Sequence, residues 1–256
     1  MLKIITRLMF CCLLAVGGLA PAVAQDDAGP SFSAVEIYTC KYKDRQGPRN
    51  LDGAVKKMND WMDKSDAPAY TAWSFTPHYV TDQQDFDFLW IGASPDFATK
   101  GASDDQFLES GGDVAEAFAE VADCAVHVNV ASLNVKPAPE GPPDQDPVIS
   151  IANCTVADGR RMDDVVAASI KWGAKRANNG STAGTWMWFP VFGGGEVGFD
   201  FTLVNGYAGH TELGQDMNAY FASQSWNAAR QTFAGLVSCD VARVYNGTLR
   251  RSPADN

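Results

Sequence analysis

"FDF" stands at residues 86–88 and again at residues 199–201, each time thirteen residues after a tryptophan, Trp73 or Trp186. Other landmarks recur in the same order around both tripeptides, with an offset that changes only from 111 to 115 positions. Such self-similarity at a nearly fixed spacing indicates an internal duplication. The fold therefore depends on what one copy forms and on how two copies fit together.

The two copies cover residues 33–135 and 148–247 and leave residues 248–256 as a short tail. Between them lies "KPAPEGPPDQDP", residues 136–147, which contains five prolines. Proline has no backbone N–H and does not fit the interior of a helix or a sheet. We therefore expect residues 136–147 to form a linker.

Each copy shows the same order of expected elements: strand, helix, strand, strand, helix, strand. This is the order of the ferredoxin-like fold, an α+β architecture. Such a sheet carries both helices on one face and leaves the other face bare, so we expect the two copies to pack sheet to sheet. The expected elements of the first copy are strands at 33–42, 69–80, 85–92 and 125–130 and helices at 51–62 and 114–121.

Four cysteines lie beyond the N-terminal leader described below, and an even number favours disulfides in an oxidising compartment. In the expected topology the first and last strands of each copy are antiparallel neighbours. This places Cys40 beside Cys124 and Cys154 beside Cys239, and we predict these two bridges. None of the four belongs to a Cys-x-x-Cys pair, so we expect no metal site.

Two ferredoxin-like units packed face to face in one chain resemble the dimeric α/β barrel superfamily, in which such units associate as separate chains or as tandem repeats. The resemblance covers nearly all of the chain after the leader and rests on topology and duplication. It implies an intramolecular barrel and would allow cofactor-independent oxygenation, isomerisation or haem chemistry. No catalytic residues of the family can be carried over position by position, and we expect no cofactor.

The N-terminus has the features of a secretory signal peptide. Lys3 and Arg7 precede an apolar run, and "AVA" at residues 22–24 is a small-x-small cleavage site. We therefore expect residues 1–24 to be removed and a periplasmic or secreted monomer without a membrane anchor. The remaining chain has 18 Lys and Arg against 31 Asp and Glu, a formal charge of −13. Such a charge argues against nucleic acid and anionic membrane surfaces as partners.

Histidines break the symmetry of the duplication, because none of the three recurs in the other copy. In "AVHVNV", residues 125–130, the valines share one strand face, which we expect to pack on the helices. His127 and Asn129 would then point into the barrel interior. There His127 is the best candidate for an acid–base role, because its ordinary pKa lies near neutrality. The alternative is a hydrogen-bonded interior histidine with a structural role. His78, near a strand end, is a second candidate for contacting a ligand.

The repeated aspartates, Asp87 and Asp200, allow two interpretations. If their phenylalanine neighbours pack beneath the helices, the carboxylates line the central cavity and are candidates for catalysis. Otherwise they bond to loop or helix donors, a structural role at the start of a strand. Aromatic residues cluster in residues 185–196, where Trp186 and Trp188 either wall a pocket for a flat apolar ligand or belong to the hydrophobic core beside a hairpin turn. Trp73 is expected near His127 as a further ligand contact.

Two functions remain open at this point. The first is a secreted or periplasmic protein that binds an apolar or aromatic small molecule between the copies, with or without catalysis. The second is a non-catalytic protein-interaction module built on a duplicated ferredoxin-like fold. An open cavity that contains His127 would favour ligand binding, whereas a filled, dry interior would favour the module.

Overall fold

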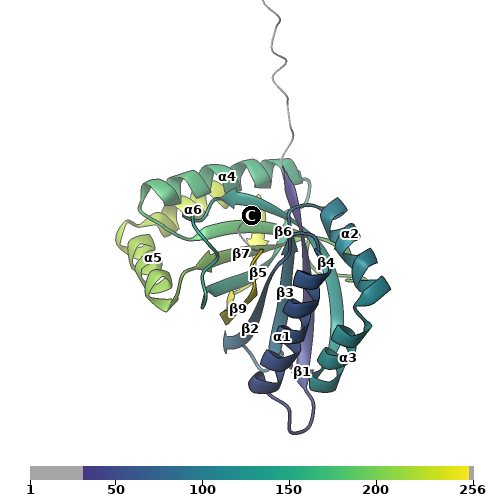
Figure 1. The fold of residues 1–256 in the computed structure, drawn as a ribbon. Helices are drawn as coiled ribbons and strands as arrows, with labels where there is room; N and C mark the ends of the chain where they lie inside the picture. Colours follow the sequence, from purple (N-terminus) through teal and green to yellow (C-terminus); the bar gives the residue numbers. More distant parts are fainter. Residues whose placement is uncertain (1–30, 254–256) are drawn as a thin grey trace, which may run out of the picture.

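The structure is a computed structural model that describes residues 31–253. The expected signal peptide, residues 1–24, lies outside the described residues. Along the described chain, single strands or pairs of strands are separated by one or two helices (Figure 1). The strands are β1 (Phe32–Tyr42), β2 (Thr71–Tyr79), β3 (Phe88–Ser94), β4 (Ala122–Lys136), β5 (Val148–Val156), β6 (Gly184–Phe192), β7 (Phe201–Tyr207), β8 (Val237–Cys239) and β9 (Arg243–Arg251), and the helices are α1 (Pro48–Lys64), α2 (Phe97–Ser110), α3 (Gly112–Val121), α4 (Met162–Asn178), α5 (His210–Ala222) and α6 (Ser225–Phe233).

The strands form one large antiparallel sheet. In the first half β1 lies between β3 and β4, and β2 pairs with the other edge of β3. In the second half β5 pairs with β7 on one side and with β8 and β9 on the other, while β6 pairs with β7. The pairs β2–β9 and β4–β6 join the halves, so the sheet closes on itself. The α+β class is thus confirmed, and the halves meet along two hydrogen-bonded strand edges that the sequence analysis did not predict.

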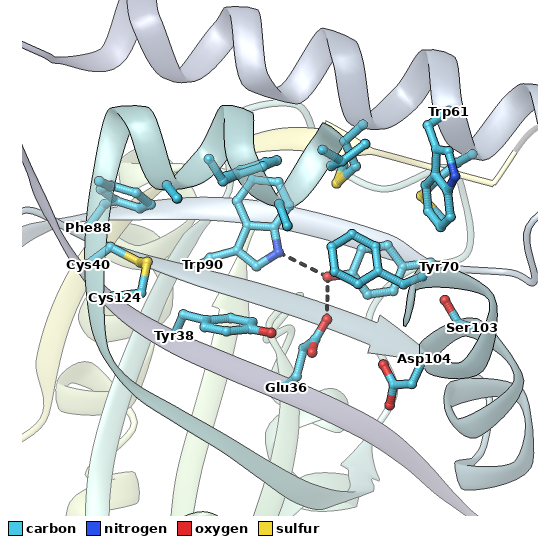
Figure 2. Close-up of a pocket in the computed structure, with 18 of the residues that line it drawn as sticks. Glu36, Tyr38, Cys40, Trp61, Tyr70, Phe88, Trp90, Ser103, Asp104 and Cys124 are labelled. Carbon is cyan, nitrogen blue, oxygen red and sulfur yellow. Dashed lines mark hydrogen bonds between the residues drawn. A yellow bond between two sulfur atoms is a disulfide. The ribbon is translucent and has the colours of Figure 1, made fainter. Parts of the chain in front are cut away.

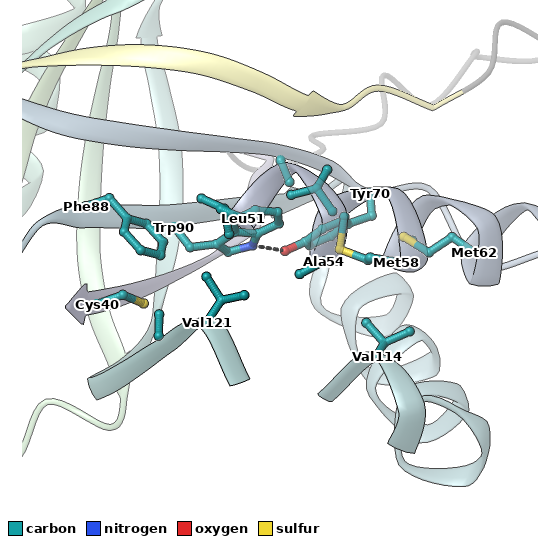
Figure 3. Close-up of a cluster of buried hydrophobic side chains, with 13 residues drawn as sticks. Cys40, Leu51, Ala54, Met58, Met62, Tyr70, Phe88, Trp90, Val114 and Val121 are labelled. Atoms are coloured by element: carbon teal, nitrogen blue, oxygen red, sulfur yellow. Dashed lines mark hydrogen bonds between the residues drawn. The ribbon is translucent and has the colours of Figure 1, made fainter. Parts of the chain in front are cut away.

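The helices lie outside the closed sheet in two groups, α1 to α3 and α4 to α6 (Figure 1). Helix α1 is amphipathic, because its buried side chains recur at helical spacing. They pack on the sheet residues Phe88 and Trp90 (Figure 3). The buried residues of α1 are Leu51, Ala54, Val55, Met58 and Met62.

Alternation along each strand separates this outer core from an inner one. On β3, Phe88 and Trp90 face the helices, whereas Leu89 and Ile91 belong to the inner core. Val130 of β4 also belongs to the inner core, which corrects our expectation that the valines of residues 125–130 pack on the helices. The reason is the register: Val130 lies opposite Val35 of β1, whose side chain points inward.

Both predicted disulfides are confirmed, Cys40–Cys124 and Cys154–Cys239. The bridged cysteines are direct cross-strand partners, the first pair between β1 and β4 and the second between β5 and β8. In the first half the bridge ties the end of β1 to the start of β4, and in the second half it ties the end of β5 to the end of β8, which precedes β9.

Some element boundaries differ from expectation. The predicted second helix of each half corresponds to α3 and α6, and each is preceded by a further helix, α2 or α5, that was not predicted. Strand β9 continues to Arg251 and pairs with β2, so residues 248–251 extend the sheet rather than forming part of a tail. Residues 137–147 connect β4 to β5 without helix or strand. Within residues 31–253, no helix is long and apolar enough to cross a membrane.

Candidate functional site

A pocket with a cavity volume of about 430 Å³ lies between α1, α2 and α3 and the side of the sheet that these helices cover. We call it the helix-side pocket. Its walls are mainly apolar or aromatic, with Trp61 and Phe107 on the helices and Trp90 on the sheet (Figure 2). Polar groups converge at one place in it, around Glu36 of β1.

Glu36 is a buried carboxylate, with only 7% of the residue exposed. Its Oε1 accepts a hydrogen bond of 2.7 Å from Tyr70 Oη, and its Oε2 lies 3.1 Å from both Lys100 Nζ and His127 Nε2. Burial raises the pKa of Glu36, but the hydrogen bonds from His127 and Tyr70 and the charge of Lys100 outweigh burial and hold this pKa below its ordinary value. Glu36 is therefore ionised at neutral pH.

Tyr70 connects Glu36 to the indole of Trp90. Its hydroxyl donates to Glu36 and accepts a hydrogen bond of 2.9 Å from Trp90 Nε1 (Figure 2). Gly92 leaves room for this hydroxyl, because a Cβ atom at Gly92 would lie 1.9 Å from Tyr70 Oη. Burial and the neighbouring charge of Glu36 raise the pKa of Tyr70 well above its ordinary value, so the hydroxyl stays protonated.

Helix α2 brings Lys100 to Glu36 from another direction. Asp96 caps this helix by accepting a hydrogen bond of 2.7 Å from Thr99 N, and Lys100 follows in the first turn. The Lys100 ammonium also pairs with Asp104, one turn further along α2. Burial lowers the pKa of Lys100, but the carboxylates of Glu36 and Asp104 raise it by more, so the ammonium stays charged.

His127 lies on the side of the sheet that the helices cover, not in the barrel interior. Its cross-strand partner is Tyr38, and the two rings stack with centroids 3.8 Å apart. Since an ionised carboxylate only accepts hydrogen bonds, His127 Nε2 carries the proton in its contact with Glu36. Asn129 lies opposite Glu36 in the register and faces the same side. The expected inward direction is thus corrected for both residues, and His127 contacts the pocket through Glu36 with 51% of its side chain exposed.

Asp87 and Asp200 occupy matching places beside the ends of β1 and β5. Asp87 Oδ2 accepts a hydrogen bond of 2.7 Å from Tyr42 N, and Asp200 Oδ2 accepts one of 2.7 Å from Val156 N. Both aspartates are exposed, and the linings of the helix-side pocket and of the inner cavity described below do not include them. These contacts correspond to the structural interpretation of the repeated "FDF". Phe88 does pack beneath the helices, but the expectation that Asp87 would then line the central cavity is wrong, because Asp87 precedes the first residue of β3. In each copy the aspartate accepts a hydrogen bond from a backbone N–H at the end of a neighbouring strand, and the phenylalanine after it is fully buried.

His78 also lies away from the helix-side pocket. It is exposed, its Nδ1 lies 3.2 Å from Nδ2 of Asn246, and its ring centroid lies 4.5 Å from that of His210. The structure therefore does not bring His78 and His127 together in one site.

The three predicted tryptophans line a different space. Trp73, Trp186 and Trp188 border a cavity of about 740 Å³ on the inner side of the closed sheet, which we call the barrel cavity. The predicted site residues therefore do not form one site. His127 contacts the helix-side pocket only through Glu36, the tryptophans border the barrel cavity, and Asp87, Asp200 and His78 border neither space.

Corresponding positions of the second half carry small or apolar side chains. Glu36 and Tyr38 lie four and two residues before the disulfide cysteine of β1, where β5 has Ser150 and Ala152. Trp90 of β3 is matched by Leu203 of β7, each two residues after the buried phenylalanine. The polar cluster around Glu36 is therefore a property of the first half.

Sequence analysis did not identify Glu36, Tyr70 and Lys100 as site residues. A signal for Glu36 was present, because it is the one acidic residue within the otherwise apolar stretch 34–38 of the first strand. Tyr70 and Lys100 gave no comparable signal. Their contacts with Glu36 span 34 and 64 positions of the chain. The first arises only when the segment before β2 folds against the sheet, and the second only when α2 packs on it.

Among the described residues, no group of three or more His, Cys, Asp or Glu side chains is placed to hold a metal ion. Haem iron needs only one or two axial ligands, usually His, Cys, Met with His, or Tyr. In the helix-side pocket the cysteines are bridged to each other and Tyr70 is engaged by two hydrogen bonds. Burial raises the pKa of Tyr38, which disfavours the phenolate that binds iron. His127 Nε2 is engaged with Glu36, and His127 is not among the residues that line the pocket. The cysteines, the two tyrosines and His127 therefore do not fit haem.

No protein-family model matches the sequence. No curated protein matches it at a significant level. Solved structures match it by fold. One is a candidate monooxygenase from Fusobacterium nucleatum subsp. nucleatum ATCC 25586, with a TM-score of 0.53 and 10% identity over 88% of this chain and 94% of that chain. Another is a candidate monooxygenase from Lactobacillus acidophilus NCFM, with a TM-score of 0.51 and 14% identity over 87% of this chain and 95% of that chain.

A third match is the chlorite dismutase from Candidatus Nitrospira defluvii in complex with imidazole, with a TM-score of 0.49 and 10% identity over 84% of this chain and 90% of that chain. Identities this low establish the fold and not the activity. The resemblance inferred from the sequence is confirmed at that level: the chain has a mixed α+β fold similar to that of the dimeric α/β barrel proteins.

Proposed function

We propose that this protein binds a small apolar or aromatic molecule with one oxygen function in the helix-side pocket. The observation that carries the proposal is the position of Glu36. A buried, ionised carboxylate with three hydrogen-bonding partners stands at the wall of a cavity whose other walls are mainly apolar. Such a pocket holds the body of a ligand by apolar contact and fixes its orientation by a few polar groups.

The size of the pocket supports a small ligand. Its volume of about 430 Å³ lies within the range of roughly 300–1,000 Å³ typical of small-molecule sites. The aromatic walls, with Trp61, Trp90 and Phe107 among them, offer flat surfaces for stacking or edge contacts. The ligand's oxygen is expected at the Glu36 end, beside Tyr38, Tyr70 and Lys100.

The ionisation states define which chemistry the cluster favours. Glu36 has a lowered pKa and is a weak base, whereas Tyr70 and Tyr38 have raised pKa values and remain neutral donors. Lys100 remains cationic. Tyr70 already donates its proton to Glu36, and the two carboxylates of Glu36 and Asp104 outnumber the one ammonium. The cluster therefore suits a neutral hydroxyl that donates to Glu36, more than an oxyanion, which the carboxylates would repel, and more than removal of a proton by Glu36. An enzyme that uses this cluster would act without a cofactor and would orient its substrate through that hydroxyl.

The proposal also includes the expectations from the sequence about the tandem repeats, the export of the protein and its monomeric state. The halves, residues 33–135 and 148–247, act as tandem ferredoxin-like repeats, supported by matching disulfides and matching aspartate contacts. Residues 1–24 direct export, and the mature protein is a periplasmic or secreted monomer. Disulfides are typical of such oxidising compartments. The alternative, a non-catalytic interaction module, is supported less well because the interior is not filled.

The test combines mass spectrometry with binding measurements on the full chain. Native mass spectrometry of the purified protein is expected to show a retained small molecule. Titration calorimetry is expected to show that 1-naphthol binds more tightly than naphthalene, because only the former offers an oxygen to the cluster. Tyr70→Phe is expected to weaken 1-naphthol about five- to tenfold, the effect of one hydrogen bond within a charged network, and to leave naphthalene unchanged.

Tyr79→Phe is the matched control, because Tyr79 is 64% exposed and stands outside the pocket. It is expected to bind both probes like the wild type. Equal affinities of 1-naphthol and naphthalene for the wild type, or equal effects of the two tyrosine substitutions, would contradict the proposal.

A further inference from the structure

The mouth of the helix-side pocket is marked by the lining residues that solvent reaches. Most of the lining is buried or half-buried, and the exposed lining residues are Asp104 of α2, Ala115 and Ala119 of α3, and Asp123 and Cys124 of β4. The pocket therefore opens along α2, α3 and the start of β4. The two charged residues at this mouth are both acidic.

The segment that forms the mouth carries a large excess of negative charge. Residues 97–124 contain seven acidic residues, all exposed, and one basic residue, the buried Lys100. The matching segment of the second half, residues 210–239, contains two acidic residues and one arginine. The excess is thus a property of the first half, like the cluster around Glu36. The seven acidic residues are Asp104, Asp105, Glu109, Asp113, Glu116, Glu120 and Asp123.

Neighbouring basic groups offset only part of this charge. Lys43 Nζ lies 3.2 Å from Asp123, and Lys100 pairs with Asp104. His127, beside the pocket, is charged only when it is protonated. Within residues 31–253, the other five acidic side chains of the segment take part in no ion pair. Carboxylates therefore outnumber ammonium groups at the mouth, and the potential there attracts a cation and repels an anion.

An aromatic side chain lies between Glu36 and one end of this mouth. Glu36 and Cys40 are four residues apart on β1, roughly 13 Å along the strand. Cys40 is bridged to Cys124, which follows Asp123. Tyr38 lines the pocket between Glu36 and the bridge (Figure 2). A molecule with a hydroxyl at Glu36 and a ring beside Tyr38 therefore extends toward the acidic mouth.

We propose that the ligand of the helix-side pocket is a phenol that carries a protonated amino group on a short chain. This inference rests on the proposed function, to which it adds the cation. The hydroxyl donates to Glu36, the aromatic walls contact the ring, and the ammonium lies at the mouth, where Asp104 and Asp123 attract it. Because the mouth is exposed, the ammonium keeps part of its water and loses little solvation energy on binding.

The test compares tyramine with 4-ethylphenol, which has the same phenol ring and lacks the amino group, by titration calorimetry on the full chain. Tyramine is expected to bind about five- to tenfold more tightly at low ionic strength, the effect of two exposed charge contacts. This advantage is expected to shrink when sodium chloride screens the carboxylates. A third probe, 3-(4-hydroxyphenyl)propionate, carries a carboxylate in place of the ammonium and is expected to bind more weakly than 4-ethylphenol.

Asp123→Asn removes one carboxylate of the mouth and keeps the aromatic walls. Its affinity for tyramine is expected to fall about threefold relative to its affinity for 4-ethylphenol. Asp158→Asn is the matched control, because Asp158 is exposed in the turn before α4 and is not among the lining residues. It is expected to bind all three probes like the wild type. Circular dichroism checks that both variants are folded.

Three results would each overturn this inference: equal affinities of tyramine and 4-ethylphenol for the wild type, tighter binding of the propionate than of 4-ethylphenol, or equal effects of the two aspartate substitutions on tyramine. If 1-naphthol still binds more tightly than naphthalene in that case, only the cationic group is refuted and the proposed function stands. If 1-naphthol and naphthalene bind equally, the proposed function itself fails.

Discussion

Replacing Glu36 by Gln tests the centre of the helix-side pocket, because it removes one charge and changes the shape little. In the wild type the carboxylate accepts a hydrogen bond from Tyr70 and neutralises Lys100, whose side chain is only 8% exposed. Glutamine keeps one acceptor oxygen but turns two donor hydrogens toward the remaining partners. The variant therefore leaves a buried ammonium with Asp104 as its remaining carboxylate.

The expected loss in unfolding free energy is about 2–3 kcal/mol at neutral pH. Removing one partner of a buried ion pair typically costs about 3–5 kcal/mol. Two features of the structure reduce this figure. Asp104 continues to pair with Lys100, and the amide oxygen of glutamine still accepts from Tyr70. Asp104→Asn is the matched control: its side chain is 55% exposed, so an effect of at most about 1 kcal/mol is expected.

The loss is expected to depend on pH. The pKa of Glu36 in the folded protein lies below its ordinary value of 4.5, so its contribution to stability is complete above that value and is lost as the pH falls through the folded-state pKa. Protonated glutamate resembles glutamine. The difference in unfolding free energy between wild type and Glu36→Gln, measured by urea denaturation, is therefore expected to shrink below pH 4.5.

Two results would refute this reasoning. One is a Glu36→Gln variant as stable as the wild type at pH 7. The other is a stability difference that stays constant down to acid pH, because a change of shape alone, without loss of charge, would produce such a constant difference.

Further predictions follow from other contacts. Gly92→Ala is expected to displace Tyr70, lower stability by about 1–3 kcal/mol and weaken 1-naphthol binding, checked by thermal melting and calorimetry. Asp87→Ala and Asp200→Ala are expected to lose similar amounts, about 1 kcal/mol each, because each removes one hydrogen bond to a backbone N–H; strongly unequal losses would contradict their matching roles. Reduction of the disulfides, which span 84 and 85 positions, is expected to lower stability by roughly 4 kcal/mol per bridge and the melting temperature with it. Residues 25–140 alone are expected to form a homodimer, detected by ultracentrifugation, because β2 and β4 lose their partner edges.

Much of the fold could be predicted because its main determinants are local or repeated. The order of strands and helices follows from periodicity, and the topology with this order makes the first and last strands neighbours, which places the paired cysteines beside each other. The closure of the sheet through β2–β9 and β4–β6 could not be predicted, because backbone hydrogen bonds between strand edges leave no pattern in side chains.

The prediction that the His127 side chain points into the barrel was wrong, and the physical reason applies to the whole sheet. A strand with helices on one side and a closed interior on the other is covered on both faces, so its apolar residues do not mark a single buried side. On β3 this is visible directly, because five consecutive residues from Phe88 to Gly92 are all buried. The valines of β4 thus gave no information about which face meets the helices, and His127 had to be placed by the register with β1.

Because neighbouring residues on a strand point to opposite faces of the sheet, they border different cavities. On β1, Glu36 borders the helix-side pocket and Val35 borders the barrel cavity, and on β3 Trp90 and Ile91 are divided in the same way. A substitution at one position changes one space directly and reaches the other only by moving the backbone. If substitution of Glu36 changes the affinity for a ligand and substitution of Val35 does not, that ligand binds in the helix-side pocket. If only the substitution of Val35 changes the affinity, the ligand binds in the barrel cavity.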